Sequence, residues 1–300
     1  MILKNTLSVP VDTLIIGGSG FVGSKIVSEA TKVADSEIAY TYATRKVDLL
    51  ARAYQVKMEE GGALERCILE TKPRVVIYCA VPFMDQALHK TVSVEGVKRT
   101  LTKLAGVNPS ARFIYMSTNA VFSGARGPCR ESDLPDPESR HDPYREYALT
   151  RAEGERIAQK MWANTIIVRT SNVDGRDIHG NLNSRLAFSV ERLRLGQALP
   201  RFCNRQISPT LVDNLAAALL EVIHPSFSYT GVLHIAGSQQ ITDYEYAKLL
   251  ARQIGVDENL VEEDFDDTPS NISLNVALTQ RLLQTRLLNV AEQLAVTFPT

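Results

Sequence analysis

A glycine-rich segment near the start of the chain has the spacing of a phosphate-binding loop. Residues 17–23 read GGSGFVG, directly after the short apolar run Thr13–Ile16 and at the start of a helical pattern. Glycine lets a pyrophosphate approach the backbone with no Cβ in the way, and a helix N-terminus offers N–H groups and partial positive charge. This context predicts a dinucleotide site, with a ligand-free tight turn as the alternative. The expected cofactor contacts here are Gly17, Gly20, Phe21, Val22 and Gly23.

The end of the second predicted strand distinguishes between two dinucleotides. An NAD site usually places Asp or Glu about 20 residues after the glycine loop, where it bonds the ribose 2′-hydroxyl. This chain instead has Ala43-Thr44-Arg45-Lys46, and no acid lies between Ile38 and Val47. Two cations suit a 2′-phosphate, so the sequence predicts NADPH/NADP+ as the cofactor, bound by Arg45 and Lys46. A solvated basic turn is the alternative.

A tyrosine and an arginine four residues apart could carry out proton transfer. Tyr147 and Arg151 lie in a helical pattern that runs to about Trp162, so their side chains are expected on one face. A fixed cation favours the phenolate of a neighbouring tyrosine, and such a tyrosine can give a proton to a carbonyl oxygen or take one back. Thr118, at the end of a predicted strand, is a candidate hydroxyl donor to the same oxygen.

Alternating strand-like and helix-like stretches must position these residues. Strands are expected at 13–16, 38–42, 54–58, 74–79, 113–116 and 165–168, and helices at 20–33, 63–72, 86–105 and 147–162. The pattern predicts an α/β fold, a Rossmann-type doubly wound parallel sheet with a small C-terminal α/β substrate lobe. We expect an NADP-binding domain over residues 1–170 and a substrate-binding lobe over 171–300. A helix over 211–223 is expected to pack back on the first domain.

Several motifs recur in a fixed order along nearly the whole chain. They are the glycine loop, the acid Glu59, the turn 79–81, STNAVFSG at 117–124, the segment 143–155 with its P-x-x-x-Y pattern, RTS at 169–171, QISPT at 206–210, GVLHIAG at 231–237 and residues 269–274. In this order they resemble the extended short-chain dehydrogenase/reductase family, and most closely its dTDP-4-dehydrorhamnose reductase-like branch. That branch also contains the non-catalytic regulatory β subunit of methionine adenosyltransferase.

The resemblance implies roles for individual residues. Tyr147 would be the proton donor, Thr118 would hold the substrate oxygen, and Arg151 would stand at the lysine position that orients the nicotinamide ribose. Besides the glycine loop and the basic turn, it assigns to the cofactor Glu59, Ala80, Tyr147 and Arg151. It assigns to the substrate Asn119, Ala120, Asn172 and Gln206.

The chain departs from the family pattern around the substrate. Arg151 replaces the family lysine, Asn119 an acid and Ala120 a tyrosine. Arginine keeps the positive charge but does not readily give up a proton, so it is a poorer member of a proton relay. A pocket built to bond particular groups rejects substrates that leave those groups unpaired. The changed pocket therefore indicates a substrate other than a deoxysugar nucleotide, or none.

These features predict an NADP-dependent oxidoreductase that reduces a carbonyl (or imine) group in a small molecule. Two alternatives stay open. A nucleotide-sugar epimerase or dehydratase would use the same tyrosine with transient oxidation. A non-catalytic, NADP-binding regulatory protein would keep the cofactor and lack the chemistry, and Arg151 is its main support.

Composition limits the partners. The 300 residues carry 33 basic and 34 acidic side chains, and this near balance gives no bulk reason to expect nucleic acid or an anionic membrane. No apolar run reaches the roughly 18 residues of a membrane helix. Four scattered cysteines with no CxxC pair, and an N-terminus without a signal-peptide pattern, fit a reducing cytoplasm. We expect no metal, reading the acidic run 262–267 as a solvated loop; a homodimer is left open.

Overall fold

The computed structural model describes residues 12–33, 36–82, 85–124, 127–139 and 144–299, so Pro143 of the family motif lies outside it. The chain forms two compact units, one of Met1–Tyr115 and Glu153–Ile166, the other of Met116–Ala152 and Ile167–Thr300. It passes from one unit to the other within three elements: β5 (Arg112–Thr118), α4 (Arg145–Met161) and β6 (Thr165–Thr170).

A parallel sheet is the framework of the first unit. Its strands before β5 are β1 (Thr13–Ile16), β2 (Ile38–Tyr42), β3 (Arg52–Gln55) and β4 (Val75–Tyr78). With β11 (Gly231–His234), the strand order of the seven-stranded sheet is β11-β6-β5-β4-β1-β2-β3, and the pairs β1/β2, β1/β4, β2/β3 and β4/β5 are parallel. The chain order reverses between β1 and β4, which is the topological switch point where such sheets bind ligands.

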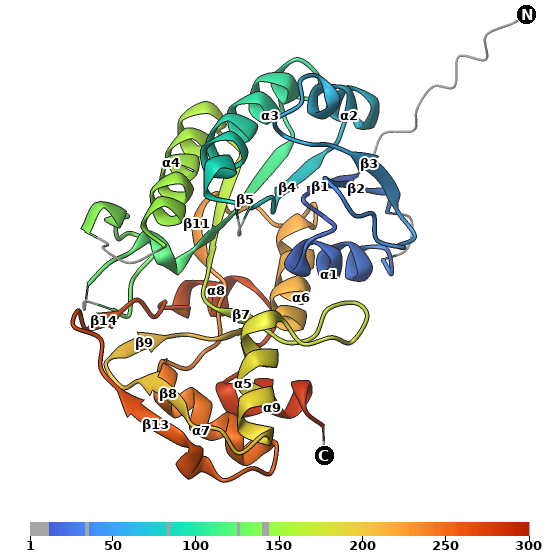
Figure 1. Ribbon diagram of the computed structural model, residues 1–300. Coiled ribbons are helices and arrows are strands. Elements are labelled where there is room, and N and C mark those ends of the chain that lie inside the picture. Colours follow the sequence, from blue (N-terminus) through green and yellow to red (C-terminus); the bar gives the residue numbers. More distant parts are fainter. Residues whose placement is uncertain (1–11, 34–35, 83–84, 125–126, 140–143, 300) are drawn as a thin grey trace, which may run out of the picture. The chain divides into compact units, whose positions relative to one another are not determined.

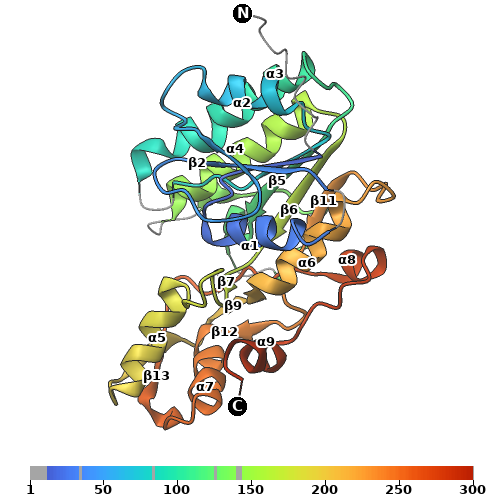
Figure 2. The same cartoon turned by 90° about the vertical axis from the view of Figure 1, so that its right-hand side faces the viewer.

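Helices cover both faces of this sheet. The side chains of Val76, Ile77 and Tyr78 in β4 are fully buried although neighbours along a strand point to opposite faces. In Figures 1 and 2, α1 (Phe21–Ala30) lies on one face, and α2 (Ala63–Thr71) and α3 (Gly96–Ala105) lie on the other. The predicted α/β fold with a doubly wound parallel sheet is confirmed.

The helix expected over residues 86–105 is divided into three parts. A 3₁₀ turn (Gln86–Leu88) and a π-helical turn (Thr91–Glu95) precede α3. The hydroxyl of Tyr78 donates to the carbonyl oxygen of Val92, and the N–H of Gly96 bonds the carbonyl of Thr91, five residues back. A side chain inserted into the hydrogen-bond ladder in this way interrupts an α-helix, and apolar periodicity does not reveal it.

The second unit is built from short elements. Its strands after β6 are β7 (Val173–Asp174), β8 (Leu199–Phe202), β9 (Arg205–Ile207), β10 (Thr210–Leu211), β11, β12 (Ile241–Thr242), β13 (Val261–Asp264) and β14 (Ser270–Asn271). Its helices are α5 (Ser184–Arg194), α6 (Val212–Ile223), α7 (Asp243–Gln253), α8 (Ala277–Leu282) and α9 (Val290–Thr297), with 3₁₀ turns at Asn119–Val121, Pro137–Ser139 and Glu258–Leu260. The small sheets are β10-β7, β12-β9-β14 and β13-β8.

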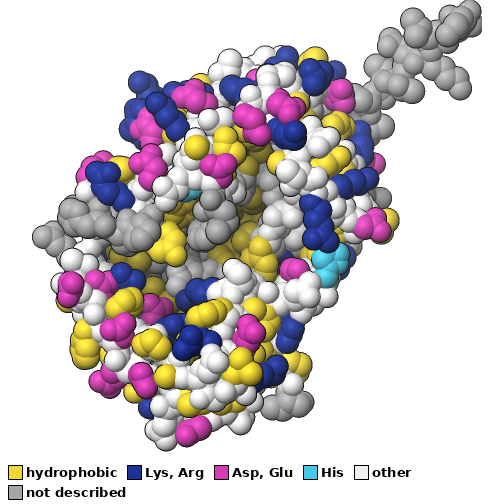
Figure 3. Space-filling view, viewed as in Figure 1, with side chains coloured by type: hydrophobic (Ala, Val, Ile, Leu, Met, Phe, Trp, Pro, Cys, Tyr) yellow, Lys and Arg dark blue, Asp and Glu magenta, His cyan; other side chains and the backbone are white. Residues whose placement is uncertain are grey.

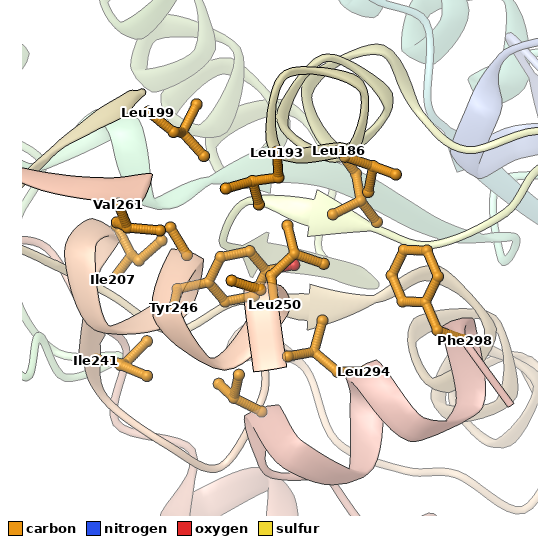
Figure 4. Packing of buried hydrophobic residues seen from close by; sticks show 14 residues of the cluster. Leu186, Leu193, Leu199, Ile207, Ile241, Tyr246, Leu250, Val261, Leu294 and Phe298 are labelled. Atoms are coloured by element: carbon orange, nitrogen blue, oxygen red, sulfur yellow. The ribbon is translucent and has the colours of Figure 1, made fainter. Parts of the chain in front are cut away.

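An apolar core joins α5, α7 and α9 of this unit. Figure 4 shows Leu186 and Leu193 of α5 directed toward Tyr246 and Leu250 of α7, with Leu294 of α9 beside them. Each of these side chains is at least nine-tenths buried. Burial of this kind contributes about 1.5–3 kcal/mol for each large apolar side chain, so helices that are short along the chain are stabilised by mutual packing.

A buried ionic cluster also lies within the second unit. Asp174 of β7 accepts hydrogen bonds from the Tyr246 hydroxyl at 2.9 Å and from Nδ2 of Asn183 at 3.0 Å, and it pairs with the guanidinium of Arg185. Burial and the Asp174 carboxylate raise the pKa of Tyr246 well above its ordinary value, so this phenol stays protonated as the donor. The cluster ties β7, α5 and α7 together.

The structure bears on two predictions for the second half of the chain, the acidic loop and the helix at 211–223. The acidic run 262–267 was expected in a loop, and that was wrong for its first part: Val261–Asp264 is strand β13, paired in parallel with β8, whereas Asp266 and Asp267 follow the strand outside any helix or strand. Within this strand Val261 is buried, whereas Glu262, Glu263 and Asp264 are exposed. The acidic residues therefore face solvent although their backbone is paired with β8. The helix expected at 211–223 is present as α6; its packing on the first domain and the boundary near residue 170 stay predictions.

Candidate functional site

The glycine loop follows β1 at the switch point and approaches the end of β4. Gly17 has φ +83°, in the left-handed region that favours glycine. A Cβ on Gly17 would lie 2.7 Å from both Cα and N of Ala80, closer than real Cβ atoms come to other heavy atoms. Ala80 therefore lies against the loop, and its contact with the cofactor stays a prediction.

The glycines of the loop have different surroundings. A Cβ on Gly23 would lie 2.3 Å from the carbonyl oxygen of Gly17, and one on Gly18 would lie 2.5 Å from Cβ of Tyr40, so both positions are needed for close packing of loop, helix and strand. A Cβ on Gly20 would meet only the Gly17 carbonyl oxygen, at 3.4 Å. Gly20 is exposed and is the N-cap of α1. This open backbone at a helix N-terminus fits a pyrophosphate.

The remaining predicted cofactor residues of the first unit lie in turns. Arg45 and Lys46 are exposed in the turn after β2, the strand that pairs in parallel with β1, so this turn and the glycine loop follow the carboxyl ends of adjacent strands. Glu59 is exposed after β3. Sequence reasoning missed Thr41, whose Oγ1 accepts the N–H of Gly17 at 2.9 Å and steadies the turn; no pattern in the sequence pointed to it.

In the second unit, the start of α4 brings Tyr147 and Arg151 together. Helical spacing places them on one face, and Cζ of Arg151 lies 6.0 Å from the centre of the Tyr147 ring. Arg151 is almost fully buried, and its guanidinium donates to the carbonyl oxygen of Met116 in β5. A guanidinium at this distance from the ring centre is within reach of a cation–π contact with the tyrosine. The Met116 carbonyl was missed because a backbone atom has no signature in the sequence.

Thr118 is the last residue of β5 and caps the short 3₁₀ turn that follows. Its Oγ1 accepts the N–H of Ala120 at 3.1 Å and donates to Oδ1 of Asn119 at 3.4 Å. Asn119 is buried, and its Nδ2 donates to Oγ of Ser171 at 3.0 Å and to the carbonyl oxygen of Ile272 at 3.1 Å. Thr118, Asn119 and Ala120 therefore form one local constellation, with Thr118 and Ala120 only partly buried.

The other two predicted substrate residues lie in different segments, Gln206 in β9 and Asn172 between β6 and β7. Gln206 of β9 accepts Nδ2 of Asn271 at 2.8 Å through its Oε1, which also accepts the side-chain amide of Gln240. Asn172 is half-buried, and its carbonyl oxygen accepts the N–H of Thr210 at 3.1 Å. Gln206 thus meets the segment around β14 that Asn119 also bonds, whereas Asn172 is tied to β10.

Two titratable groups of the second unit are shifted toward their neutral forms. Burial lowers the pKa of His234 to about 3, and the charge of Arg169 adds to the effect; Nδ1 of the ring lies 3.1 Å from the carbonyl oxygen of Asn275. Burial also raises the pKa of Glu131 above its ordinary value. The His234 shift lowers the stability of this unit in acid, because the unfolded chain binds that proton first, whereas the Glu131 shift acts in the opposite direction.

The face of the molecule shown in Figure 3 carries a mixture of charges, with acidic and basic side chains interspersed. Across the described residues, no helix is both long and apolar enough to cross a bilayer. The same part of the chain holds no cluster of three or more His, Cys, Asp or Glu side chains arranged for a metal ion.

The strand order, the switch-point glycine loop and the Tyr147–Arg151 pair define a dinucleotide-binding α/β protein of the doubly wound class. The chain belongs to the family described as the RmlD substrate binding domain, whose model matches residues 11–280. This confirms the resemblance to the extended short-chain dehydrogenase/reductase family and its dTDP-4-dehydrorhamnose reductase-like branch. Family membership supports an oxidoreductase in general terms.

Known proteins of several kinds are similar to this chain. Methionine adenosyltransferase 2 subunit beta of Xenopus tropicalis is 24% identical over 248 residues, 79% of this chain and 70% of the relative. The spore coat polysaccharide biosynthesis protein SpsK of Bacillus subtilis is 25% identical over 253 residues, 81% of this chain and 80% of the relative. The structure of dTDP-4-dehydrorhamnose reductase from Bacillus anthracis in complex with NADP has a TM-score of 0.77 and 18% identity, covers 97% of this chain and 98% of that one, and demonstrates the shared fold.

Proposed function

We propose that this protein is an NADPH-dependent reductase that converts a carbonyl or imine group of a small molecule, with Tyr147 as the proton donor. The observation that carries the proposal is the Tyr147–Arg151 pair, in which a buried guanidinium lies 6.0 Å from the centre of the tyrosine ring. The open backbone of the glycine loop supports a bound dinucleotide. A structural relative named as a reductase was crystallised with NADP, which agrees with the cofactor proposed.

The chain's own residues would divide the work. Gly17, Gly20 and Gly23, with the first turn of α1, would hold the pyrophosphate, and Arg45 and Lys46 the 2′-phosphate. When bound, NADPH would supply the hydride. Tyr147 would give its hydroxyl proton to the oxygen of the reacting carbonyl, and Arg151 would stabilise the phenolate left behind. Thr118 would hold the same oxygen through its hydroxyl.

The wider substrate contacts follow the resemblance. Ala120, Asn172 and Gln206 would face the substrate, and Glu59 would lie beside the adenosine of the cofactor. Because Asn119 and Ala120 replace an acid and a tyrosine of the family, we propose a substrate other than dTDP-4-dehydrorhamnose. We also propose a cytoplasmic protein, with no nucleic-acid or membrane partner.

A second candidate function is a regulatory protein that binds NADP without turning over a substrate. The engagement of Arg151 with the Met116 carbonyl favours it, because a guanidinium held by the backbone of β5 has less freedom to serve a ribose and a proton relay. One of the relatives is named as a subunit of another enzyme, which is compatible with such a role.

A fluorescence titration followed by a turnover assay tests the proposal. NADPH should bind more tightly than NADH, and equal affinity would exclude the 2′-phosphate assignment. NADPH oxidation is then measured with a panel of small ketones, aldehydes and imines, with dTDP-4-dehydrorhamnose as the family probe. Tyr147→Phe should lower any turnover by about a hundredfold or more, and the variant should still bind NADPH through the glycine loop.

The matched control is Tyr144→Phe, which removes a hydroxyl from an exposed tyrosine three residues earlier. It should retain turnover. Retained turnover in Tyr147→Phe would refute the mechanism. NADPH binding without turnover of any compound would favour the regulatory candidate.

A further inference from the structure

Both N–H groups of the Asn119 side chain are used inside the protein. Nδ2 lies 3.0 Å from Oγ of Ser171 and 3.1 Å from the carbonyl oxygen of Ile272, and the residue is only 3% exposed. An amide nitrogen has two donors, so these two contacts use both of them. Asn119 therefore keeps no N–H for the substrate contact that the resemblance implied for this position.

The orientation of the amide is fixed by its partners. The carbonyl oxygen of Ile272 can only accept, so Nδ2 of Asn119 must face it and Oδ1 must point the other way. On that side lies Oγ1 of Thr118, at 3.4 Å. The Thr118 hydroxyl also accepts the N–H of Ala120 at 3.1 Å, so its rotation is restrained from two directions.

The same amide belongs to a chain of neutral hydrogen bonds. Oγ of Ser171 also accepts the N–H of Ser208 at 3.3 Å, and Oγ of Ser208 accepts the N–H of Leu274 at 3.1 Å. These bonds link the end of β5 to three segments that are distant in the sequence. They give the serines of the RTS and QISPT motifs a role that the motifs alone did not reveal.

We propose that Asn119 is a positioning residue that orients the Thr118 hydroxyl and fixes the segment 272–274 to the end of β5. The proposal rests on the proposed function, because it assigns Thr118 to the substrate oxygen. The hydrogen bond from Thr118 to Oδ1 of Asn119 is long, at 3.4 Å, so the hydroxyl can redirect its hydrogen bond from Oδ1 to a bound substrate oxygen. The position requires an amide, since a carboxylate at residue 119 would face the Ile272 carbonyl with no proton between the two oxygens.

The test is Asn119→Asp, which keeps the size of the side chain and removes both donors. With the carbonyl compound that the wild type turns over best, kcat at pH 8 should fall about tenfold or more, because a displaced hydroxyl misaligns the reacting group. KM for NADPH should stay unchanged. Lowering the pH should restore kcat in this variant alone, because the protonated acid can again donate to Ile272.

The matched control is Asn164→Asp. Nδ2 of Asn164 also donates to a backbone carbonyl oxygen, that of Ser110 at 3.2 Å, but in an exposed position of the first unit. This variant should show wild-type kcat and no new ionisation. In a Thr118→Val background, Asn119→Asp should lower kcat no further, because Asn119 acts through Thr118. A full additional loss in that background, or an unchanged pH profile in Asn119→Asp, would overturn the proposal.

Hydrogen exchange separates this inference from the proposed function. At pH 8 the amide of Leu274 should exchange faster in Asn119→Asp than in the wild type or in Asn164→Asp. If the wild type turns over no compound, the proposed function fails, and exchange decides whether Asn119 fixes the segment. Unchanged exchange at Leu274 would then refute that part as well.

Discussion

The glycine loop of the first unit and the Thr118–Arg151 region of the second unit are held by different kinds of contact. In the loop, backbone atoms approach so closely that Gly17, Gly18 and Gly23 tolerate no Cβ. In the second region, side chains make the contacts: Arg151 to the Met116 carbonyl, and Asn119 to Ser171 and Ile272. A site formed by closely packed backbone atoms has no room for side chains, so glycine is required at these positions. A side-chain site can change residue by residue, and the departures from the family pattern occur there.

The largest expected effect is in the backbone-built region. Gly23→Ala places a Cβ 2.3 Å from the Gly17 carbonyl oxygen, so helix α1 must move away from the loop. We expect the free energy of unfolding to fall by about 3 kcal/mol, with loss of NADPH binding. Urea denaturation and NADPH fluorescence measure both.

Gly20→Ala sharpens this test. Its Cβ would meet only one atom, at 3.4 Å, so the stability should stay within about 0.5 kcal/mol of the wild type. NADPH affinity should still fall, because the methyl group occupies the approach of the pyrophosphate. Equal destabilisation by the two substitutions would show that the loop packs differently from this description.

The exposed side chains of Arg45 and Lys46 in the first unit should determine whether NADPH or NADH binds more tightly. The double substitution Arg45→Ser and Lys46→Ser would remove the two charge-assisted hydrogen bonds that we propose to the 2′-phosphate, so NADPH affinity should fall about a hundredfold while NADH affinity is unchanged. The control, Arg156→Ser with Lys160→Ser, removes the same charge from exposed positions on α4. If the control substitutions weaken NADPH binding by a similar factor, the effect comes from the net charge of the protein and not from contacts of Arg45 and Lys46.

In the second unit, Tyr246→Phe removes one of the donors to the buried Asp174 carboxylate. We expect the free energy of unfolding to fall by about 2 kcal/mol, since a buried acceptor loses a partner. Tyr244→Phe is the matched control, because among the contacts described the Tyr244 hydroxyl accepts a hydrogen bond only from the amine of Lys248, and it touches no buried charge. Unfolding monitored by circular dichroism compares them; equal stability of the two variants would contradict the role of the cluster.

The effect that is smallest near neutral pH concerns acid sensitivity. The pKa of His234 is about 3 in the folded protein and 6.5 in the unfolded chain, so between these values only the unfolded chain binds the proton. Stability is complete above pH 6.5 and falls as the pH decreases, by up to about 1.4 kcal/mol for each pH unit. His234→Asn, which keeps a donor toward the Asn275 carbonyl, should flatten this slope. If the free energy of unfolding falls equally steeply with pH in the wild type and in His234→Asn, groups other than His234 cause the acid sensitivity.

Sequence reasoning predicted the elements whose pattern is local. The buried strand β4, the glycine loop and the helical spacing of Tyr147 and Arg151 could be predicted because each depends on neighbours within a few residues. The π-helical turn could not, because its cause is the hydroxyl of Tyr78 from another element. Strand β13 was missed for the same kind of reason: it pairs with β8, about 60 residues away, and shows mostly acidic residues.

The site follows the same division. The order of the motifs along nearly the whole chain, with Tyr147, Thr118 and the glycines among them, was sufficient to predict the family and, in general terms, an oxidoreductase. The structure decided how the substituted residues are used: Arg151 meets the carbonyl of Met116, and Asn119 meets that of Ile272, 153 positions away in sequence. Carbonyl oxygens are present at every residue, so nothing in the sequence distinguishes the two that are used. Only tertiary folding brings such a backbone acceptor to a buried amide or guanidinium and thereby fixes the direction of the side chain.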